Sequence, residues 1–413
     1  MKTAEILAIG SELLTPFRQD TNSLYLSDQL ERLGIAVVQK TIVGDDRERL
    51  KQAFAEALKR ADLVIGIGGL GPTDDDRTRY AVAELLGVRL ERQEEIVAMM
   101  QERFHARGKK MPAVNLRQAD VPQGADWLPN PNGTAPGLWL TPQPGKTLIL
   151  LPGPPHELRP MFEEHCLPRL RPLASKQAFA TKVLKVTGLA ESEVEERIGH
   201  LYREVTNPQT TLLASPGLIE IHVRATGPDT SAALRRAEEL ADQLDTALGD
   251  AVFSRGSETL EQVVGLYLMM RGSTLAVAES CTGGLLGERL SGVPGSSRYF
   301  LGGVVCYSNR LKTKLLDVPE ALLKRKGAVS SEVAESLARS VRRRAGASLG
   351  LAITGIAGPD GGSPDKPVGT IHIALADAHR VKSVKHRFLG DRERIRWQAT
   401  QAALDLVRRK LAK

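Results

Sequence analysis

The sequence predicts a multidomain α/β protein built from three parts. Segments with the hydrophobic pattern of strands alternate with amphipathic helices in the first and last parts of the 413-residue chain. Between them, the order of expected elements changes to β-α-β-β-α-β. At roughly 100–200 residues per domain, a chain of this length holds two to four domains. We expect domains over residues 1–172, 173–256 and 257–413.

The first part begins with a βαβαβ alternation, which is typical of a parallel sheet with helices on both faces, a three-layer αβα sandwich. Strands are expected at residues 5–10, 35–43, 62–67 and 147–151, and helices at 20–33 and 47–60. The last of these strands runs into a loop of prolines and glycine. The stretch 168–175, with two prolines and mixed charge, predicts the end of this part.

The middle and last parts follow different patterns. The middle part predicts a small split βαβ sandwich, with strands at residues 182–187, 210–214, 218–225 and 251–254, and with helical apolar stripes at Val194, Ile198 and Leu201 and at Leu234, Ala237, Leu240 and Leu244. The last part returns to α/β alternation, with strands at 274–278, 302–306, 348–353, 370–376 and 380–388, helices at 282–290 and 331–344, and a basic C-terminal helix.

Charge and aromatic content argue against nucleic acid as the partner. The chain has 56 basic and 49 acidic residues, a net charge of +7 and a pI near 9.3, but these charges are interspersed. The densest basic run, residues 342–344, lies in a helical pattern with its own apolar stripe, which we interpret as a solvated helix face. Aromatic residues make up only 4%, too few for extensive base stacking. A mild positive excess suits small anionic substrates.

Cysteine usage and hydropathy predict a cytoplasmic protein without a membrane partner. Cys166, Cys281 and Cys306 form no CxxC pair, and the eight histidines form no HExxH motif, so no structural zinc is expected. The first residues resemble a strand rather than a signal peptide. No apolar run approaches the roughly 18 residues that span a bilayer.

A first candidate site follows the strand that ends at Ile67. The motif GGLGPTDDD, residues 68–76, places glycines at a strand-to-helix turn, where backbone amides can face an anion. It has neither Walker A nor GxGxxG spacing, and its adjacent aspartates would repel a phosphate unless a cation lies between them. The alternative is a plain turn before a helix with an acidic start.

Two further loops, residues 132–137 and 151–157, are rich in glycine and proline. They are expected at the same sheet edge, as is Glu12, which follows the first strand. The candidate residues of this first site are Glu12, Gly68, Gly69, Gly71, Thr73, Asp75, Asp76, Gly133 and Gly153, with Asp75 and Asp76 as candidate metal ligands.

A second candidate site is the motif AESCTGG, residues 278–284, again between a strand and a helix. Ser280 and Cys281 are both potential nucleophiles, and amides at the helix start would suit an oxyanion or a phosphate. The alternative is a serine that only caps the helix. Lys312, in the motif YSNRLK, is one of several lysines that would act as the base of a Ser–Lys mechanism if desolvated.

A long loop over residues 354–370 contains five glycines and three prolines, and loops longer than about 12 residues are usually functional. Arg392, Arg394 and Arg396 start the final helix, where an arginine can bind phosphate or carboxylate. The candidate substrate-binding residues are Thr282, Gly283, Gly284, Tyr307, Asn309, Thr354, Gly355 and Gly358.

Over essentially the whole chain, these motifs resemble those of the CinA family of bacterial competence/damage-inducible proteins. AESCTGG, the segment Tyr307-Ser308-Asn309 with Lys312, and TGIAGPDGG followed by KPVGT are similar to the family's carboxy-terminal domain. GGLGPT followed by aspartates, and LPGPP, are similar to its amino-terminal domain, which itself resembles molybdopterin-binding proteins. The middle unit resembles the family's KH-like domain.

The resemblance implies that the carboxy-terminal domain is a nicotinamide-nucleotide amidase, which hydrolyses nicotinamide mononucleotide to nicotinate mononucleotide and ammonia. It implies Ser280, Lys312 and Arg394 as catalytic residues, with the nucleophile on Ser280 rather than Cys281, and requires no metal or other cofactor for this reaction. The roles proposed from the residues fit, because Ser280 would attack the carboxamide and Lys312 would carry its proton.

For the amino-terminal domain, the resemblance implies an ADP-ribose pyrophosphatase that uses a divalent metal ion and yields AMP and ribose 5-phosphate. Asp76 aligns with the functional aspartate of the molybdopterin-binding relatives. The run 15–22 departs from the family pattern beside this site. The expected partners are therefore nicotinamide mononucleotide and ADP-ribose, together with a second copy in a homodimer.

The alternative is a non-enzymatic protein, associated with competence or with DNA damage, that binds nucleotides or nucleic acid. The pI and the KH-like middle unit favour this alternative. RNA-binding KH domains hold the RNA backbone with a GxxG loop. No GxxG occurs between residues 181 and 254, so we expect a spacer or dimer contact there rather than a nucleic-acid site.

Overall fold

The computed structural model describes residues 2–173 and 178–412, which form two compact units. One unit comprises the described residues up to Ala180 with Thr226–Ala233, and the other comprises Thr181–Ala225 with the described residues from Leu234 onward. Across both described stretches, none of the helices combines the length and the apolar character that a membrane crossing requires.

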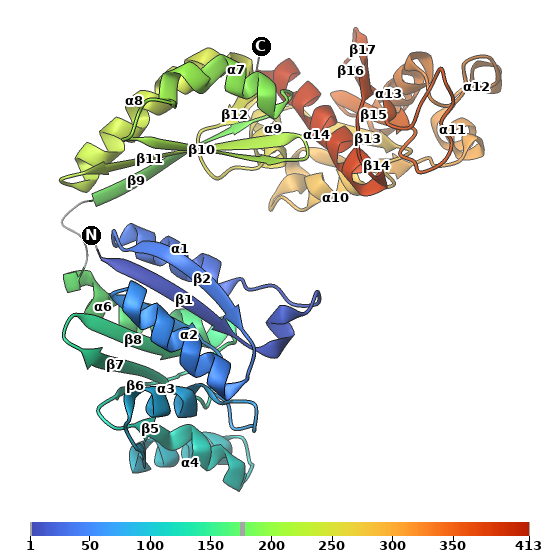
Figure 1. Ribbon diagram of the computed structural model, residues 1–413. Coiled ribbons are helices and arrows are strands. Elements are labelled where there is room, and N and C mark those ends of the chain that lie inside the picture. Colours follow the sequence, from blue (N-terminus) through green and yellow to red (C-terminus); the bar gives the residue numbers. More distant parts are fainter. Residues whose placement is uncertain (1, 174–177, 413) are drawn as a thin grey trace. The chain divides into compact units, whose positions relative to one another are not determined.

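A six-stranded sheet in the order β2-β1-β3-β8-β7-β6 forms the centre of the first unit (Figure 1). Its strands are β1 (Thr3–Ile9), β2 (Ala36–Val43), β3 (Leu63–Ile67), β6 (Asp126–Leu128), β7 (Gly137–Gln143) and β8 (Lys146–Leu151). The parallel pairing of β1, β2, β3 and β8 confirms the prediction. The sequence did not reveal β6 and β7, which add antiparallel pairs and make the sheet mixed.

Helices cover both faces of this sheet, so the three-layer αβα sandwich is confirmed (Figure 1). Helices α2 (Arg47–Arg60), α3 (Thr78–Leu86) and α4 (Glu94–Ala106) enclose one core, and α1 (Asn22–Arg32), α5 (Pro155–Met161) and α6 (Leu167–Leu170) enclose the other. Ile6 and Leu7 are adjacent in β1 but belong to opposite cores, as expected for a strand buried on both faces. A two-stranded sheet, β4 (Leu90–Arg92) with β5 (Asp120–Pro122), lies outside the main sheet.

The boundary stretch 168–175 is helical as far as Leu173, and its last two residues lie outside the described residues. The middle part then follows the predicted β-α-β-β-α-β order, and its strands form a four-stranded sheet in the order β10-β11-β9-β12. Its elements are β9 (Ala178–Val186), α7 (Glu191–Tyr202), β10 (Gln209–Ser215), β11 (Leu218–Gly227), α8 (Thr230–Leu248) and β12 (Val252–Ser254).

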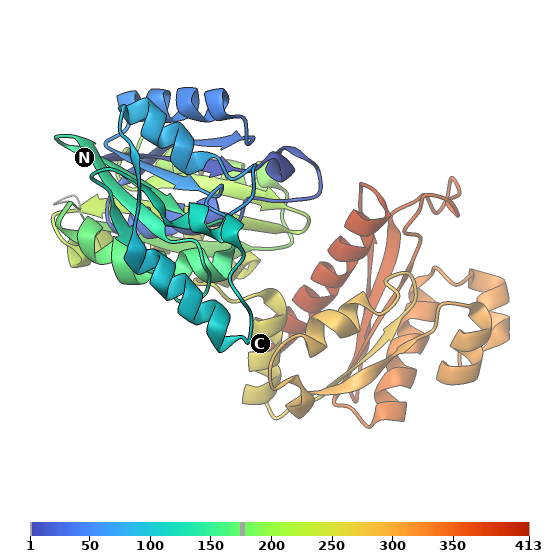
Figure 2. The same ribbon diagram turned by 90° about the horizontal axis from the view of Figure 1, so that it is seen from below.

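The last part contains a five-stranded sheet in the order β14-β13-β15-β16-β17. Its strands are β13 (Leu275–Glu279), β14 (Phe300–Val305), β15 (Leu349–Gly355), β16 (Thr370–Ala376) and β17 (Val381–Arg387). Its helices are α9 (Leu260–Met270), α10 (Leu285–Ser291), α11 (Asn309–Leu316), α12 (Glu320–Lys326), α13 (Ser331–Ala345) and α14 (Arg392–Leu411). Helices α9 and α14 pack on one face, as Figure 2 shows for α14, and α13 packs on the other.

Two details of this part differ from the prediction. Strand β13 extends through Glu279, so Ser280 is the first residue after the strand. Helix α10 begins at Leu285 rather than at residue 282, because Gly283 and Gly284 adopt left-handed φ angles of +62° and +101°. Residues 281–284 therefore form a turn that precedes the helix.

The basic run at residues 342–344 closes helix α13, whose apolar stripe Val333, Leu337 and Val341 is buried. Arg343 and Arg344 are exposed, and Arg344 pairs with Asp317 at 2.7 Å. The prediction of a solvated helix face is confirmed.

Candidate functional site

Ser280 and Lys312 meet at the carboxyl end of strand β13. The Nζ atom of Lys312 lies 3.0 Å from the Oγ atom of Ser280. The two residues are 32 positions apart in the sequence, and the fold joins them because α11 begins just after the neighbouring strand β14. The backbone amide of Ser280 donates to the carbonyl of Ile353 in β15, which fixes the turn against the sheet.

The surroundings of Lys312 favour a neutral amine. Lys312 is only 1% exposed, and burial lowers the pKa of its side chain. Besides Ser280, its Nζ atom contacts the carbonyl oxygens of Cys306 at 2.9 Å and of Tyr307 at 3.1 Å. A neutral amine can donate its two protons to these carbonyls and direct its lone pair at the Ser280 hydroxyl. This is the arrangement that a general base for a serine nucleophile requires.

Cys281 and Ser280 differ sharply in their chemistry. Cys281 is buried in the core formed by α9, α10 and α14, and burial raises the pKa of its thiol to about 12. The thiol therefore stays protonated near neutral pH, whereas a thiolate is the reactive form of cysteine. Of the two nucleophiles that the motif left open, the geometry favours Ser280.

The predicted anion-binding role of the turn amides is only partly compatible with the structure. The side chain of Glu279 accepts hydrogen bonds from the amides of Gly284, Leu286 and Gly287 at 2.8–3.1 Å. The amide of Gly283 donates to the carbonyl of Ser280 at 3.1 Å. Because Gly283 and Gly284 already have partners within the protein, they are not free donors for an oxyanion or a phosphate. This corrects the expectation for these two glycines.

Two arginines of α14 contact the loops around Ser280. Arg396 donates to the carbonyl oxygen of Thr282, and Arg392 donates to the carbonyl of Gly358 at 2.7 Å and to the Tyr307 hydroxyl at 2.8 Å. They lie four residues apart, so they share one face of the helix.

Arg394, the arginine that the resemblance selected, lines one cavity together with Arg392 and Arg396 and also borders a second one. The second cavity, of about 480 Å³, is also lined by His386, Phe388 and Gln398. The described residues include no hydrogen bond from the Arg394 guanidinium to the Ser280 turn. The catalytic role of Arg394 stays a prediction.

The remaining predicted residues of this site lie in strand β15, in the loop that follows it and at the start of α11. Thr354 is buried and donates its hydroxyl to the carbonyl of Ala328 at 2.8 Å. Gly355 ends strand β15, and Gly358 provides the carbonyl that Arg392 binds. Tyr307 is exposed, and Asn309 is the first residue of helix α11. The long loop 354–370 is therefore tied to the start of α14 through Gly358.

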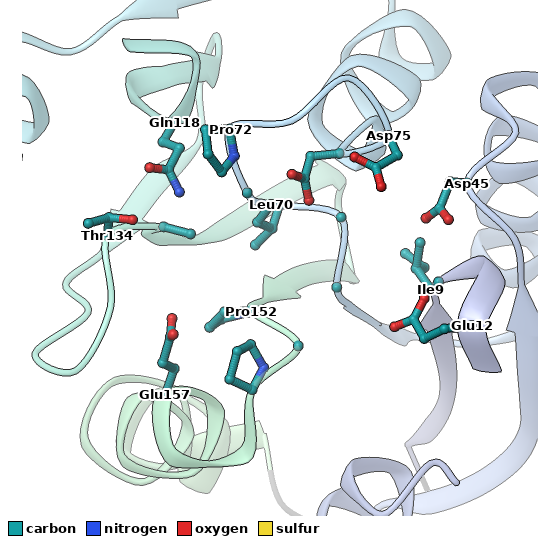
Figure 3. A pocket seen from close by; sticks show the side chains of 18 residues that line it. Ile9, Glu12, Asp45, Leu70, Pro72, Asp75, Gln118, Thr134, Pro152 and Glu157 are labelled. Carbon is teal, nitrogen blue, oxygen red and sulfur yellow. The ribbon is translucent and has the colours of Figure 1, made fainter. Parts of the chain in front are cut away.

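A second candidate site lies in the first unit, in a cavity of about 380 Å³ at the carboxyl ends of β1, β3 and β8. Five carboxylates line it, and the described lining residues include no lysine or arginine. They are Glu12, Asp45, Asp75, Asp76 and Glu157. In Figure 3, Glu12, Asp45 and Asp75 lie on one side of the cavity and Glu157 on the other. Such a lining disfavours an anion unless a cation accompanies it.

Several contacts hold the acidic loop of this cavity in place. Thr73 donates its amide at 2.9 Å and its hydroxyl at 2.5 Å to Asp76. A hydrogen bond from Thr73 also lowers the pKa of Asp75. The buried Arg79 donates to the carbonyls of Leu70 and Gly71 at 2.7 and 2.9 Å. Arg79 therefore holds the loop in place through two of its backbone carbonyls, although Arg79 itself does not line the cavity.

Most residues predicted for this site line the cavity, with two exceptions. Thr73 supports Asp76, and Gly133 lies in the adjacent turn, where its amide donates to Asn130. Asp45, Gln118 and Glu157 also line the cavity but were not among the predicted site residues. Asp45 follows strand β2, and Glu157 lies in the first turn of α5, close after β8, so the sheet-edge rule could have found both. Gln118 comes from a short 3₁₀ segment and carried no comparable signal.

The donor set of the cavity suits a metal ion shared with a substrate. Within residues 2–173 and 178–412, no three histidine, cysteine or acidic side chains converge closely enough to hold an ion by themselves. Mg²⁺ is commonly bound by one or two carboxylates together with substrate phosphates. Asp75 and Asp76 fit this mode of binding.

Comparison with known protein families assigns the whole chain. The model of the CinA C-terminal domain matches residues 257–411, the "Probable molybdopterin binding domain" matches residues 5–172, and the damage-inducible protein CinA KH domain matches residues 181–254. A CinA-like protein of Koribacter versatilis is 51% identical over 411 residues, which cover 99% of each chain. The chain belongs to the CinA family.

Another CinA-like protein and one solved structure are also similar to this chain. A CinA-like protein of Acidobacterium capsulatum is 50% identical, again with 99% of each chain covered. The solved structure of the competence damage-inducible protein A of Klebsiella pneumoniae is 30% identical, covers 38% of this chain and 98% of its own, and has a TM-score of 0.36.

Proposed function

We propose that the carboxy-terminal part of this CinA-family chain is an amidase that hydrolyses nicotinamide mononucleotide to nicotinate mononucleotide and ammonia. The observation that carries the proposal is the buried contact of 3.0 Å between Lys312 Nζ and Ser280 Oγ. The other partners of Lys312 are uncharged carbonyls, which suit an amine that gains and loses a proton.

The first half of the reaction forms an acyl-enzyme. Ser280 Oγ attacks the carboxamide carbon while its proton passes to Lys312 Nζ. The tetrahedral intermediate then expels the amide nitrogen, which takes the proton from Lys312 and leaves as ammonia. An ester between Ser280 and the nicotinate carbonyl remains.

The second half regenerates the enzyme. A water molecule attacks the ester while Lys312 takes a proton from it, and this proton returns to Ser280 Oγ when the ester bond breaks. The net reaction consumes one amide and one water and yields one carboxylic acid and one ammonia. Lys312 can play both roles because burial brings its pKa closer to neutrality.

The choice of substrate rests on the family resemblance and on the charge around the site. A mononucleotide carries a phosphate, and Arg392 and Arg396 both donate hydrogen bonds to the loops around Ser280. Both now donate to backbone carbonyls or a hydroxyl, which are weaker partners for an arginine than a phosphate. We therefore assign substrate anchoring to this pair.

The test is ammonia release from nicotinamide mononucleotide by the full chain. Ser280→Ala and Lys312→Met should both reduce release to background, because each removes one of the two groups that move the proton. Folding of each variant is checked by circular dichroism. Release that persists in a folded Ser280→Ala variant would disprove the serine mechanism.

A second activity is proposed for the amino-terminal unit, namely metal-dependent hydrolysis of ADP-ribose to AMP and ribose 5-phosphate. The observation that favours it is the cavity with five carboxylates and no basic residue among its described lining. Asp75 and Asp76 would hold a divalent cation, which would neutralise the pyrophosphate and lower the pKa of a water molecule. AMP formation should require added Mg²⁺ or Mn²⁺ and should be lost in Asp76→Ala.

A further inference from the structure

The carboxylate of Glu279 has no role in the reaction described above, yet it is the side chain most tightly bound to the turn that carries Ser280. It ends strand β13 and is 1% exposed. Its Oε2 atom accepts from the amides of Gly284 at 3.0 Å and Leu286 at 3.1 Å, and its Oε1 atom accepts from Gly287 at 2.8 Å. No lysine or arginine among the described residues forms an ion pair with it.

These three hydrogen bonds fix the turn that contains Ser280 between strand β13 and helix α10. Ser280 follows Glu279, whose backbone belongs to the sheet, and precedes Gly284, Leu286 and Gly287, whose amides the Glu279 side chain binds. The hydrogen bond from Gly284 to the Glu279 carboxylate closes a ring around the four residues 280–283. A second hydrogen bond, from the Gly283 amide to the Ser280 carbonyl, lies within this ring. The left-handed glycines Gly283 and Gly284 allow the chain to follow this path.

The backbone of Glu279 is also linked to the segment that positions the base. Its carbonyl accepts the Cys306 amide at 2.8 Å and the Cys306 thiol at 3.5 Å. The next acceptors along that segment, the carbonyls of Cys306 and Tyr307, bind Lys312 Nζ. Glu279 therefore contacts the supports of both the nucleophile and the base.

We propose that Glu279 is the positioning residue that holds Ser280 Oγ in line with Lys312 Nζ, an inference that rests on the amidase function proposed above. Its carboxylate does this by accepting hydrogen bonds from the amides of the turn, which would otherwise bind water or an anion. Reacting groups must be held within fractions of an ångström, and a displacement of about 1 Å can reduce the rate about 100-fold.

Two variants test which property of the Glu279 side chain positions Ser280. Glu279→Gln changes its hydrogen-bonding groups and charge, and Glu279→Asp changes its length. Glutamine keeps the length of the side chain, but its NH₂ group faces amide donors and cannot accept from them. Aspartate keeps the charge but is one methylene shorter. Glu320→Gln is the matched control, because Glu320 is an exposed carboxylate in the first turn of α12, a helix of seven residues like α10.

For ammonia release from nicotinamide mononucleotide, Glu279→Gln should lower kcat about 10- to 100-fold while KM changes less than about threefold. Glu279→Asp should recover part of this loss, and Glu320→Gln should match the wild type. The fraction of active molecules is measured in parallel by titration with a fluorophosphonate, which labels activated serines. A change confined to that fraction or to the thermal midpoint would assign Glu279 to folding alone and overturn the proposal.

The labelling rate at Ser280, located by mass spectrometry of peptides, distinguishes failure of this inference from failure of the proposed function. If the wild type is labelled but releases no ammonia, the proposed substrate is wrong, and slower labelling of Glu279→Gln still supports positioning. If both variants are labelled at the wild-type rate, Glu279 does not position the serine. If the wild type is neither labelled nor active, both proposals fail.

Discussion

Lys312 shows how a single residue acquires a chemical role from burial. A charged ammonium is costly to bury without a carboxylate partner, and the described contacts of its Nζ atom are to a hydroxyl and two carbonyls. Loss of its proton removes most of this cost. The same environment that would destabilise the charged form therefore supplies a base at lower pH than an exposed lysine can.

The pH dependence of ammonia release should report this proton. Because only the neutral amine accepts the Ser280 proton, kcat/KM should rise with pH through the pKa of Lys312, and this limb should lie below the ordinary lysine value of about 10.4. Lys312→Arg keeps its charge at every accessible pH and should be inactive throughout. A rate that is independent of pH, or that falls as pH rises across this range, would contradict the assignment.

Cys281 should be dispensable. Its thiol is buried and protonated near neutral pH, so Cys281→Ala should retain kcat within about threefold. Iodoacetamide should leave Cys281 unmodified in the native protein at pH 7 and modify it after unfolding in urea. Loss of activity in a folded Cys281→Ala variant would move the nucleophile to this residue.

At the scale of single elements, strand β3 shows how tightly the first unit is packed. A Cβ atom at Gly66 would lie 2.8 Å from Phe54 Cζ and 2.9 Å from Leu150 Cδ2, both in a fully buried core. Gly66→Ala should lower the free energy of unfolding by about 1–3 kcal/mol in urea denaturation, provided that the first unit unfolds as one transition.

A double-mutant cycle identifies the cause of that loss. Phe54→Leu removes the ring that would clash, so the penalty of Gly66→Ala should be smaller in the Phe54→Leu background. Equal penalties in both backgrounds would show that the contact with Leu150 or the backbone of β3, not the contact with Phe54, accounts for the loss.

The elements themselves were largely predictable. Helix α2 matches its predicted range, and strands β1, β2, β3 and β8 lie within a few residues of theirs, because strand and helix periodicities are local properties of the sequence. Strands β6 and β7 were missed. β6 has only three residues. β7 has seven, but Pro142 lies within it, and a proline weakens the sequence pattern of a strand.

At the scale of the whole molecule, the two candidate sites lie in different units of the chain. The cavity with five carboxylates belongs to the first unit, and Ser280 and Lys312 belong to the second. Neither site shares a residue with the other. The three family matches run along the chain in the same order as the predicted domains, whose boundaries after residues 172 and 256 stay predictions.

The two proposed activities should therefore be separable in the full-length protein. Asp76→Ala should abolish Mg²⁺-dependent AMP formation from ADP-ribose and leave ammonia release within about twofold of the wild type. Ser280→Ala should do the reverse. Both products are measured on the same preparations, with and without EDTA. Simultaneous loss of both activities in either folded variant would contradict independent sites.

Local residue patterns were enough to identify the family, the order of most elements and the motifs around both sites. Burial and long-range contacts in the folded protein were needed to distinguish Lys312 from the other lysines and Ser280 from Cys281, and to show that Arg392 and Arg396 bind the Ser280 loops. The structure also shows that Glu279 already binds the amide of Gly284, one of the residues expected to bind substrate. These outcomes depend on burial and on contacts between residues distant in sequence, which set pKa values and decide which donors stay free.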